Sequence, residues 1–437
     1  AGGTVAFTGV LSGTGNVTIG GLGTVLLNTN NTFSGIVTVN SGATVSVAVM
    51  GTNTNSTTVS SLGIGSTTNG KITLNGGTIR YTGAGEYASN AISFTSSGGT
   101  IDASGTGAIS LRKGSGGAGL TQNANVTITL SGTNAMTNMY NAVITNATGF
   151  ATTVAKTGTG NWELTGSSTY TGGLDIYAGR IVVGGGAEIT NSLGAGEVRI
   201  YNGGGIRSSG TVTRVDSTNH VYKLGGSNYI DWMDIGKVTL TNNTTVIGNT
   251  AIGGETIPVS GNSTTTTLGS NTGIQESGGP FSLTKSGANS VLILNGANSY
   301  SGGTFVTSGT LNVTNTGTLG SASSAVTVSG GTLDLGAAAR TNATVTVSGG
   351  TLQNGSFSAT TVNITGGTIA NTVTNTAATI NISGGTLGTS ALSASSAFNY
   401  GGGATGISTV ALGGAGRFYL TNSTLTLSDN FNTLTGG

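Results

Sequence analysis

The feature that most constrains this chain is a short repeat built around a pair of glycines near its C-terminal end. The octapeptide VTVSGGTL at 326–333 recurs with similar residues at 345–352, 362–369 and 380–387. The glycine pairs begin at positions 330, 349, 366 and 384, so the successive steps are 19, 17 and 18 residues. Two related segments lie in the N-terminal half, at 72–79 and 92–101. Tandem repeats at a near-constant period indicate a repeat architecture.

Each repeat reads as a strand with period-two alternation, a Gly-Gly corner and a second short strand. A glycine pair between alternating segments also fits a two-residue hairpin, so a β-sandwich or meander is an alternative. A unit of about 20 residues cannot bury its few apolar side chains alone, whereas similar units stacked in tandem bury them against one another. The repeat therefore predicts an all-β parallel β-helix (β-solenoid) of roughly 20 coils, with essentially no α-helix.

Composition supports the same fold class. The chain has 81 glycines among 437 residues, and only 6% of its residues are charged. Thr, Ser, Asn and Gly replace the usual helix formers, which argues against helices. Intrinsic disorder fits poorly, because 35% of the residues are hydrophobic and Val, Ile and Leu alternate regularly. Stacked outward positions favour Thr and Asn, which can hydrogen-bond along the stack, over like charges, which would repel.

Several partners and sites are excluded by composition. Net charge is +1 without a basic stripe, so we expect no nucleic-acid partner. No apolar segment reaches the roughly 18 residues that span a bilayer, so no membrane span is predicted in this chain. Cysteine is absent, which excludes disulfides and thiolate metal sites. We predict no cofactor and no metal. Because Ala1 is not an initiator Met, the chain is expected to be processed or trimmed.

A longer cassette occurs three times, at about 18–47, 156–183 and 283–313. The last copy contains the segment NSYSGGTFVTSGTLNV at 298–313. An aromatic residue precedes a glycine by nine residues in every copy. The pairs are Phe33 and Gly42, Tyr170 and Gly179, and Tyr300 and Gly309.

These cassettes resemble the autotransporter-associated β-strand repeat of bacterial surface proteins, whose pattern is L-x-K-x-G-x-G-x-L-x-L-x-G-x-N-x-Y-S-G-G-T-x-V-x-x-G-T-L-x-V. The 283–313 copy matches nearly throughout, and the 18–47 copy lacks the lysine and the second glycine. The motif covers about a fifth of the chain. The resemblance implies a right-handed β-helix exported to the outer surface of a diderm bacterium or beyond it, as in autotransporter passengers and adhesins.

Catalysis is not expected. β-Helix enzymes that act on polysaccharides gather several acids on one face, whereas the acids here are scattered along the sequence, for example Asp102, Asp175, Asp334 and Asp429. No phosphate-binding glycine loop leads into a helix. We therefore predict no catalytic, cofactor-binding or metal-binding residue, and the protein is predicted not to be an enzyme.

The densest polar cluster interrupts the repeat at 214–234, where we predict an insertion or an irregular coil. Trp and Tyr can stack on sugars, while Asp and Asn hydrogen-bond their hydroxyls, so this segment is the candidate glycan contact. The more conservative interpretation is a wider coil in which the His and Trp side chains are packing residues. The candidate glycan contacts are Asp216, His220, Tyr229, Asp231, Trp232 and Asp234.

Other singled-out residues are interpreted as structural. Lys156 and Lys285 are expected to hold their ammonium groups in solvent above apolar stems. The aromatic residue of each cassette is expected to pack within a coil, and the glycines to form corners. The predicted structural repeat positions are Phe33, Gly42, Tyr170, Gly172, Gly179, Tyr300, Gly302 and Gly309.

Residues 1–437 are therefore predicted to form a single continuous β-solenoid, with the short Gly-Gly repeats at 326–388. The predicted function is that of an extracellular structural or adhesin-type rod for surface display, adhesion or coat formation. One alternative is a self-assembling filament subunit that associates end to end or side by side, and another is a glycan-binding passenger domain. The expected partners are cell-surface or matrix components, including glycans, at the outer surface of a diderm bacterium.

Overall fold

The structure is a computed structural model in which the chain forms two compact units. Unit 1 comprises Ala1–His220 with Ala251–Pro258, and unit 2 comprises Val221–Thr250 with Val259–Gly437. The structure describes residues 2–51, 59–64, 71–111, 120–121, 124–184, 192–209, 214–215, 220–231, 233–248, 264–314, 316–371, 373–388, 391–405, 409–412 and 417–420. Every regular element in these ranges is a strand, as the sequence predicts.

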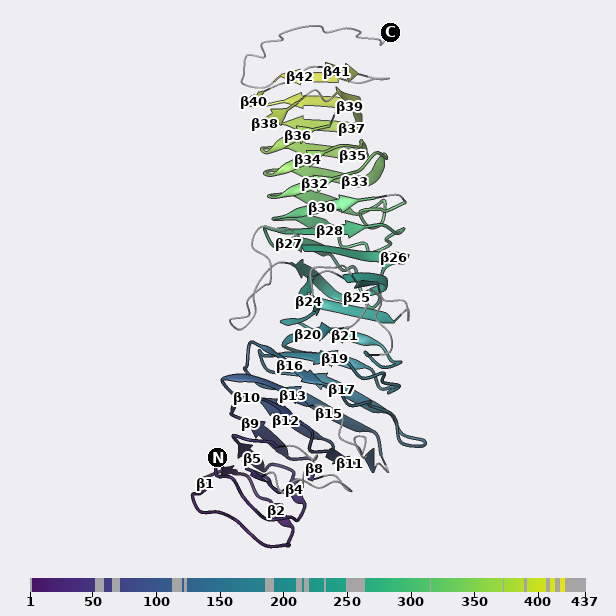
Figure 1. Ribbon diagram of the computed structural model, residues 1–437. Coiled ribbons are helices and arrows are strands. Elements are labelled where there is room, and N and C mark those ends of the chain that lie inside the picture. The colour runs from purple at the N-terminus through teal and green to yellow at the C-terminus, as the bar shows by residue number, and fades with distance from the viewer. Residues whose placement is uncertain are drawn as a thin grey trace. The chain divides into compact units, whose positions relative to one another are not determined.

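Unit 1 stacks its strands in three parallel ladders (Figure 1). The first contains β1 (Thr4–Phe7), β3 (Thr24–Leu27), β5 (Thr44–Val47), β9 (Thr78–Tyr81), β12 (Gly99–Ala103), β15 (Val126–Ser131), β17 (Thr152–Lys156), β19 (Leu174–Ile176) and β21 (Val198–Ile200). The second contains β10 (Ala84–Ala88), β13 (Gly107–Leu111), β16 (Thr137–Tyr140), β18 (Asn161–Leu164), β20 (Gly179–Val183) and β22 (Gly204–Ser208). The third contains β2 (Val17–Ile19), β4 (Val37–Asn40), β8 (Ile72–Asn75), β11 (Ile92–Thr95) and β14 (Leu120–Thr121).

Three short strands of unit 1 lie outside these ladders. The pair β6 (Val59–Ser60) and β7 (Gly63–Ile64) is antiparallel, in contrast to the parallel ladders around it. The third is β23 (Arg214–Val215).

Unit 2 begins with three long strands and continues as a regular stack (Figure 1). The long strands are β24 (Val221–Asp231), β25 (Met233–Ile247) and β26 (Thr264–Glu276). One ladder follows β25 and contains β27 (Leu283–Ser286), β29 (Thr304–Val306), β31 (Ala325–Val328), β33 (Arg340–Val347), β35 (Phe357–Ile364), β37 (Thr374–Ile382) and β39 (Ala391–Tyr400). The other follows β26 and contains β28 (Ser290–Leu294), β30 (Thr310–Val313), β32 (Thr332–Asp334), β34 (Thr351–Gln353), β36 (Thr368–Ala370), β38 (Gly385–Leu387) and β40 (Ala404–Thr405). β39 also pairs with β41 (Thr409–Leu412) and β42 (Arg417–Leu420).

Register explains why the sequence repeats. Val326 lies beside Val345, and Val345 lies beside Val362, in parallel strands. Each rung therefore places identical or similar residues about 4.8 Å apart, and their side chains stack along one column. The inward valines and leucines of the repeat are fully buried, while the Thr, Asn and Asp positions between them are only half-buried. The predicted all-β parallel solenoid is confirmed, and a stack of antiparallel hairpins is excluded for the Gly-Gly repeats.

Each Gly-Gly corner uses its two glycines differently. A Cβ on the first glycine, for example Gly349, would lie 2.4 Å from the carbonyl oxygen of Ser329 in the preceding coil. The second, Gly350, has φ of +64°. The first position therefore needs a close backbone approach, and the second needs a conformation that L-residues rarely adopt. Both requirements follow from stacking one corner directly on another.

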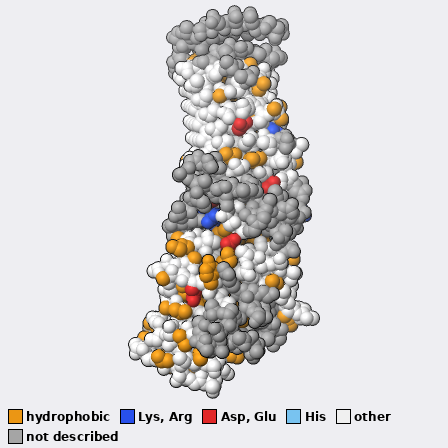
Figure 2. Space-filling model, viewed as in Figure 1, with side chains coloured by type: hydrophobic (Ala, Val, Ile, Leu, Met, Phe, Trp, Pro, Cys, Tyr) orange, Lys and Arg blue, Asp and Glu red, His pale blue; other side chains and the backbone are white. Residues whose placement is uncertain are grey.

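The outward positions form polar ladders. Asn381 donates through Nδ2 to Oδ1 of Asn363 at 2.8 Å, and Asn399 donates in the same way to Asn381 at 2.7 Å. The face shown in Figure 2 carries few charged side chains among the described residues. Hydrophobic side chains gather on that face mainly over the N-terminal unit (Figure 2). Each unit is a stack of coils, and continuity of the solenoid over residues 1–437 stays a prediction.

Candidate functional site

The candidate glycan residues divide between the two units. His220, in unit 1, is 6% exposed, and its Nε2 lies 2.9 Å from the carbonyl oxygen of Gly194. In unit 2, Asp231 is 1% exposed, whereas Tyr229 is half-buried. Asp234 is also half-buried, and its Oδ1 accepts a 2.6 Å hydrogen bond from Ser270 Oγ. A buried side chain such as Asp231 offers no surface to a ligand in this conformation.

Two members of the candidate glycan set, Asp216 and Trp232, lie outside the described residues. Glycan contact at 214–234 therefore stays a prediction. No group of three or more His, Cys, Asp or Glu side chains within the described ranges is placed to hold a metal ion.

The aromatic residue of each cassette lies in the interior of its coil. Phe33 is 2% exposed, and Tyr170 and Tyr300 are fully buried. The Tyr300 hydroxyl lies 2.7 Å from Oγ1 of Thr304, which in turn donates to the carbonyl oxygen of Leu319 at 3.0 Å. Burial raises the pKa of both tyrosines above the ordinary value of 10.0.

The glycines of the cassettes occupy corners of two kinds. Gly42, Gly179 and Gly309 have φ of +80°, +64° and +70°. A Cβ on Gly172 would lie 2.5 Å from the carbonyl oxygen of Thr152, and one on Gly302 would lie 2.4 Å from the carbonyl carbon of Phe281. The first three glycines satisfy a conformational requirement. The other two allow one coil to approach the next closely.

The two cassette lysines are buried, which corrects the expectation that their ammonium groups lie in solvent. Lys156 is fully buried and Lys285 is 1% exposed. Lys156 Nζ donates to the carbonyl oxygens of Thr157, Gly158 and Ala178 at 2.6, 2.8 and 2.9 Å. Three carbonyl acceptors match the three N–H bonds of an ammonium group, so the corner itself replaces water.

Lys285 makes the equivalent contacts in unit 2. Its Nζ donates to the carbonyl oxygens of Ser286 and Gly287 and to Oγ of Ser290, the last two at 3.1 and 2.6 Å. Desolvation lowers the pKa of Lys156 from 10.5 to about 7 and that of Lys285 to about 8, and the charge of Asp231 partly opposes the change at Lys285.

These lysines also explain the glycine that closes each cassette. A Cβ on Gly179 would lie 2.7 Å from Lys156 Nζ, and one on Gly309 would lie 2.6 Å from Lys285 Nζ. Lysine and glycine, 23 or 24 residues apart in sequence, therefore occupy one packed corner. The sequence carries the signal for burial, because Lys156 and Lys285 stand two residues after the core residues Val154 and Leu283.

A third buried lysine packs against the N-terminal cassette from outside residues 18–47, and that copy lacks the motif lysine. Lys71 is 1% exposed, and its Nζ lies 4.5 Å from the centroid of the Phe33 ring. It also donates to the carbonyl oxygen of Gly35. Desolvation lowers its pKa to about 8, while the aromatic face and the carbonyl stabilise the charge. Lys71 thus couples the aromatic position of this cassette to a later coil.

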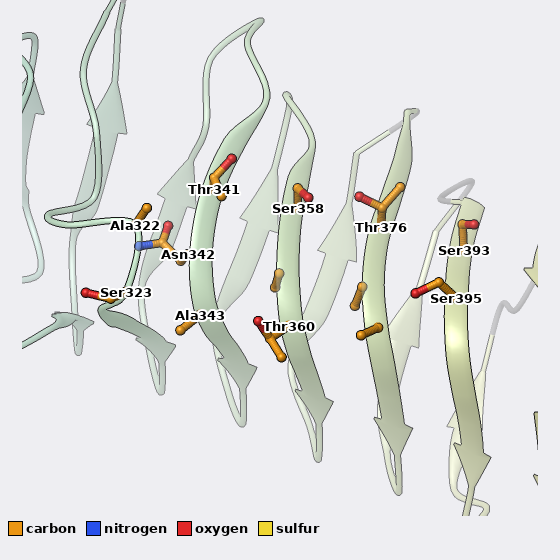
Figure 3. A pocket seen from close by; sticks show the side chains of 13 residues that line it. Ala322, Ser323, Thr341, Asn342, Ala343, Ser358, Thr360, Thr376, Ser393 and Ser395 are labelled. Carbon is orange, nitrogen blue, oxygen red and sulfur yellow. The ribbon is translucent and has the colours of Figure 1, made fainter. Parts of the chain in front are cut away.

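Outside the cassettes, an open hollow lies on the outward face of unit 2. Its volume is about 840 Å³, and it crosses four parallel strands, β33, β35, β37 and β39 (Figure 3). Hydroxyl residues in register line it on each strand, namely Thr341, Ser358, Thr376 and Ser393, and Thr360 and Ser395 add two more. Every lining residue is Ala, Ser, Thr or Asn, so the hollow offers hydrogen bonds but no acid, base or nucleophile activated by one.

Comparison with known proteins identifies the cassettes. The family model described as Passenger-associated-transport-repeat matches residues 17–47, 154–183 and 283–313, which are the segments that contain the buried aromatic residues and closing glycines. The chain contains three passenger-associated-transport repeats. The predicted resemblance to the autotransporter-associated β-strand repeat is therefore confirmed. In the last two copies of the repeat, a lysine is buried against the closing glycine at one corner, and the aromatic ring is buried beside another glycine, Gly194 or Gly320.

One curated relative is similar to most of the chain. The "Adhesin BmaC autotransporter" of Brucella suis biovar 1 (strain 1330) is 30% identical over an alignment of 361 residues, and the match covers 75% of this chain. The match covers 10% of that adhesin, so the chain spans about a tenth of the relative's length. The search of solved structures found no match. Within the part of the chain that the structure describes, no helix is long and apolar enough to cross a membrane.

Proposed function

We propose that this chain is a segment of an adhesin-type passenger displayed at the outer surface of a Gram-negative bacterium, where it serves as a stiff spacer. The observation that carries the proposal is the in-register parallel ladder, which connects every coil of a unit to its neighbours through backbone hydrogen bonds. Bending such a stack requires many hydrogen bonds to be strained together. The three passenger repeats and the similarity to an autotransporter adhesin support export and surface display.

Electron microscopy and small-angle X-ray scattering of the purified chain test the spacer role. We expect single, unbranched, elongated particles whose long dimension grows by about 4.8 Å for every coil. Compact particles would contradict the proposal. Long fibres would instead support the filament alternative, in which copies associate end to end.

Adhesion is tested separately, on cells. Bacteria that display the passenger should attach to surface or matrix components more than isogenic cells in which residues 1–437 are deleted. Equal attachment would restrict the role of the chain to spacing.

We also propose that the chain has no catalytic activity. Glycosidases need a pair of carboxyl groups on either side of the substrate. Here Asp102 accepts from Arg80 Nε at 2.9 Å, and Asp175 pairs with Arg199, so both carboxylates are engaged in ion pairs. Incubation with bacterial and host polysaccharides should release no new reducing ends.

A further inference from the structure

One outward patch of unit 1 departs from the Thr, Ser and Asn pattern of the solenoid surface. It lies on β19, β21 and the residues beside them, and we call it the tyrosine patch. Its inward neighbours Leu174, Ile176, Val198 and Ile200 are buried, so the residues between them face outward. The patch consists of Asp175, Tyr177, Glu197, Arg199 and Tyr201.

Two exposed aromatic rings form the centre of the tyrosine patch. The rings of Tyr177 and Tyr201 stack with centroids 4.6 Å apart and planes 8° from parallel. They remain 44% and 40% exposed, respectively. In a chain with 5% aromatic residues, two adjacent coils thus present stacked phenol rings to solvent.

Among the described residues, one ring face of this stack has no aromatic neighbour. Tyr177 N donates to the carbonyl oxygen of Lys156, so Thr157 holds the equivalent place one coil earlier. A threonine side chain is too short to cover a phenol ring. The face of Tyr177 that is turned toward Thr157 is therefore accessible, which agrees with the large exposure of this residue.

Charged groups are fixed beside the rings. Asp175 and Arg199 are register partners, and Arg199 Nε donates to Asp175 Oδ1. Arg199 Nη2 donates to the carbonyl oxygen of Gly172 at 2.9 Å, and Nη1 lies 3.5 Å from Oε2 of Glu197. The Glu197 side chain is 40% exposed. Rigid donors and acceptors therefore flank an apolar, aromatic surface.

We propose that the tyrosine patch binds an uncharged saccharide. A pyranose ring presents C–H groups on one face and hydroxyls around its edge, and it would place the C–H face on Tyr177. Its hydroxyls would then hydrogen-bond with Glu197 and with the phenol and guanidinium groups of Tyr201 and Arg199. The site differs from the candidate contacts at 214–234, and it rests on the proposed adhesin function by naming the ligand class.

Two other kinds of ligand fit less well. An extended peptide binds by adding a strand to an open sheet edge, but β19 is hydrogen-bonded on both sides, by β17 and β21. An acidic polysaccharide would meet two carboxylates and one guanidinium, a net charge of −1 for the patch. The chemistry therefore favours neutral sugars.

Isothermal titration of the whole chain tests the proposal directly. The probes are neutral oligosaccharides of glucose, galactose, mannose and N-acetylglucosamine, with heparin as the acidic comparison. We expect at least one neutral probe to bind and Tyr177→Ala to weaken its binding at least tenfold. Tyr87→Ala is the matched control, because Tyr87 is 66% exposed in the same unit but lies on β10. Binding by no neutral probe, or equal binding by Tyr177→Ala, would overturn the proposal.

A measurement on the unsubstituted protein keeps the test independent of how the variants fold. Nitration of exposed tyrosines with tetranitromethane, followed by mass spectrometry, should be slowed at Tyr177 and Tyr201 by the bound saccharide but unchanged at Tyr87. Unprotected Tyr177 would also overturn the assignment. Neither result depends on particle shape, so failure of the saccharide site and failure of the spacer role are distinguishable.

Discussion

At the scale of single residues, the lysine and the tyrosine of the last two passenger-associated-transport repeats are core residues and not surface residues. Their lysines are buried against the closing glycines, and their tyrosines are buried beside Gly194 and Gly320. The ammonium of Lys285 fills the space that a Cβ on Gly309 would occupy. Residue differences between the copies of the repeat should therefore change the free energy of unfolding.

The two buried tyrosines should respond oppositely to loss of the hydroxyl. Tyr300→Phe should lower the free energy of unfolding by about 1 kcal/mol, because the hydrogen bond between the Tyr300 hydroxyl and Thr304 is lost. Among the described residues, the Tyr170 hydroxyl has no hydrogen-bond partner, since Leu174 stands where the other copy has Thr304. Tyr170→Phe should therefore leave stability unchanged or raise it by about 1 kcal/mol. Urea denaturation measures both, and equal losses would contradict the assignment.

Buried lysines make stability depend on pH. The folded-state pKa values of Lys71, Lys156 and Lys285 lie near 7 to 8, below the ordinary value of 10.5. Between these values the unfolded chain binds more protons, so the free energy of unfolding should rise from about pH 7 to about pH 10. Denaturation curves across this range measure the slope.

The matched variants for this slope are Lys156→Met and Lys285→Met, each of which should flatten the rise even though it also lowers stability. Above about pH 10 the sign reverses. The pKa values of Tyr140, Tyr170 and Tyr300 are raised by burial, so the unfolded state loses protons first and stability falls as pH rises further. A flat profile in the unsubstituted protein would contradict the lowered pKa values of the buried lysines.

The closing glycine should tolerate no side chain. Gly309→Ala places a methyl group 2.2 Å from the carbonyl oxygen of Gly287 at φ of +70°, so we expect a loss of more than about 2 kcal/mol. Gly279→Ala is the control, because its nearest atoms belong to the Phe281 ring at 3.4 Å. Thermal unfolding compares the two, and similar midpoints would contradict the proposed crowding.

At the scale of strands, the unit of structure is one coil. Residues 344 and 361 are register partners in β33 and β35, as are 345 and 362. Deletion of 344–360 would therefore join Ala343 to Thr361 and leave every later side chain on its own face. We expect this variant to fold with an unchanged circular dichroism spectrum per residue.

Deletion of half a coil should prevent correct folding. Deletion of 344–352 would place the corner of one coil beside a strand of the next. Residues that follow the deletion would then turn their inward side chains outward and their outward side chains inward. We expect a loss of cooperative unfolding and binding of a hydrophobic dye. If both deletions folded equally well, register would not control this stack.

The Gly-Gly spacing predicted parallel stacking because only directly superimposed corners require glycines at both places in every copy. The burial of Lys285 could have been predicted from the alternation of inward and outward residues, since Lys285 follows the core residue Leu283 by two positions. The general expectation that lysine is solvated outweighed this signal. The tyrosine patch could not be predicted from the sequence. Tyr177 and Tyr201 meet only through a 24-residue step between Leu174 and Val198, which differs from the 17 to 19 residues of the short repeats.

At the scale of the whole molecule, stability comes from hydrogen bonds and apolar burial rather than from charge. The chain has 14 basic and 13 acidic residues among 437. Raising NaCl from 0.05 to 0.5 M should therefore change the free energy of unfolding by less than about 1 kcal/mol. Denaturation at the two concentrations measures the effect, and a larger change would indicate a charge network that stabilises the fold.

The ladders described above have no closing contact. A β-barrel must return to its first strand, so its geometry fixes how many strands it contains. In the described strands of each unit, a coil pairs with the coils before and after it. Such pairing does not fix the number of coils. The length of a protein built in this way is therefore free to change by duplication or loss of single coils, while every contact within a coil stays the same.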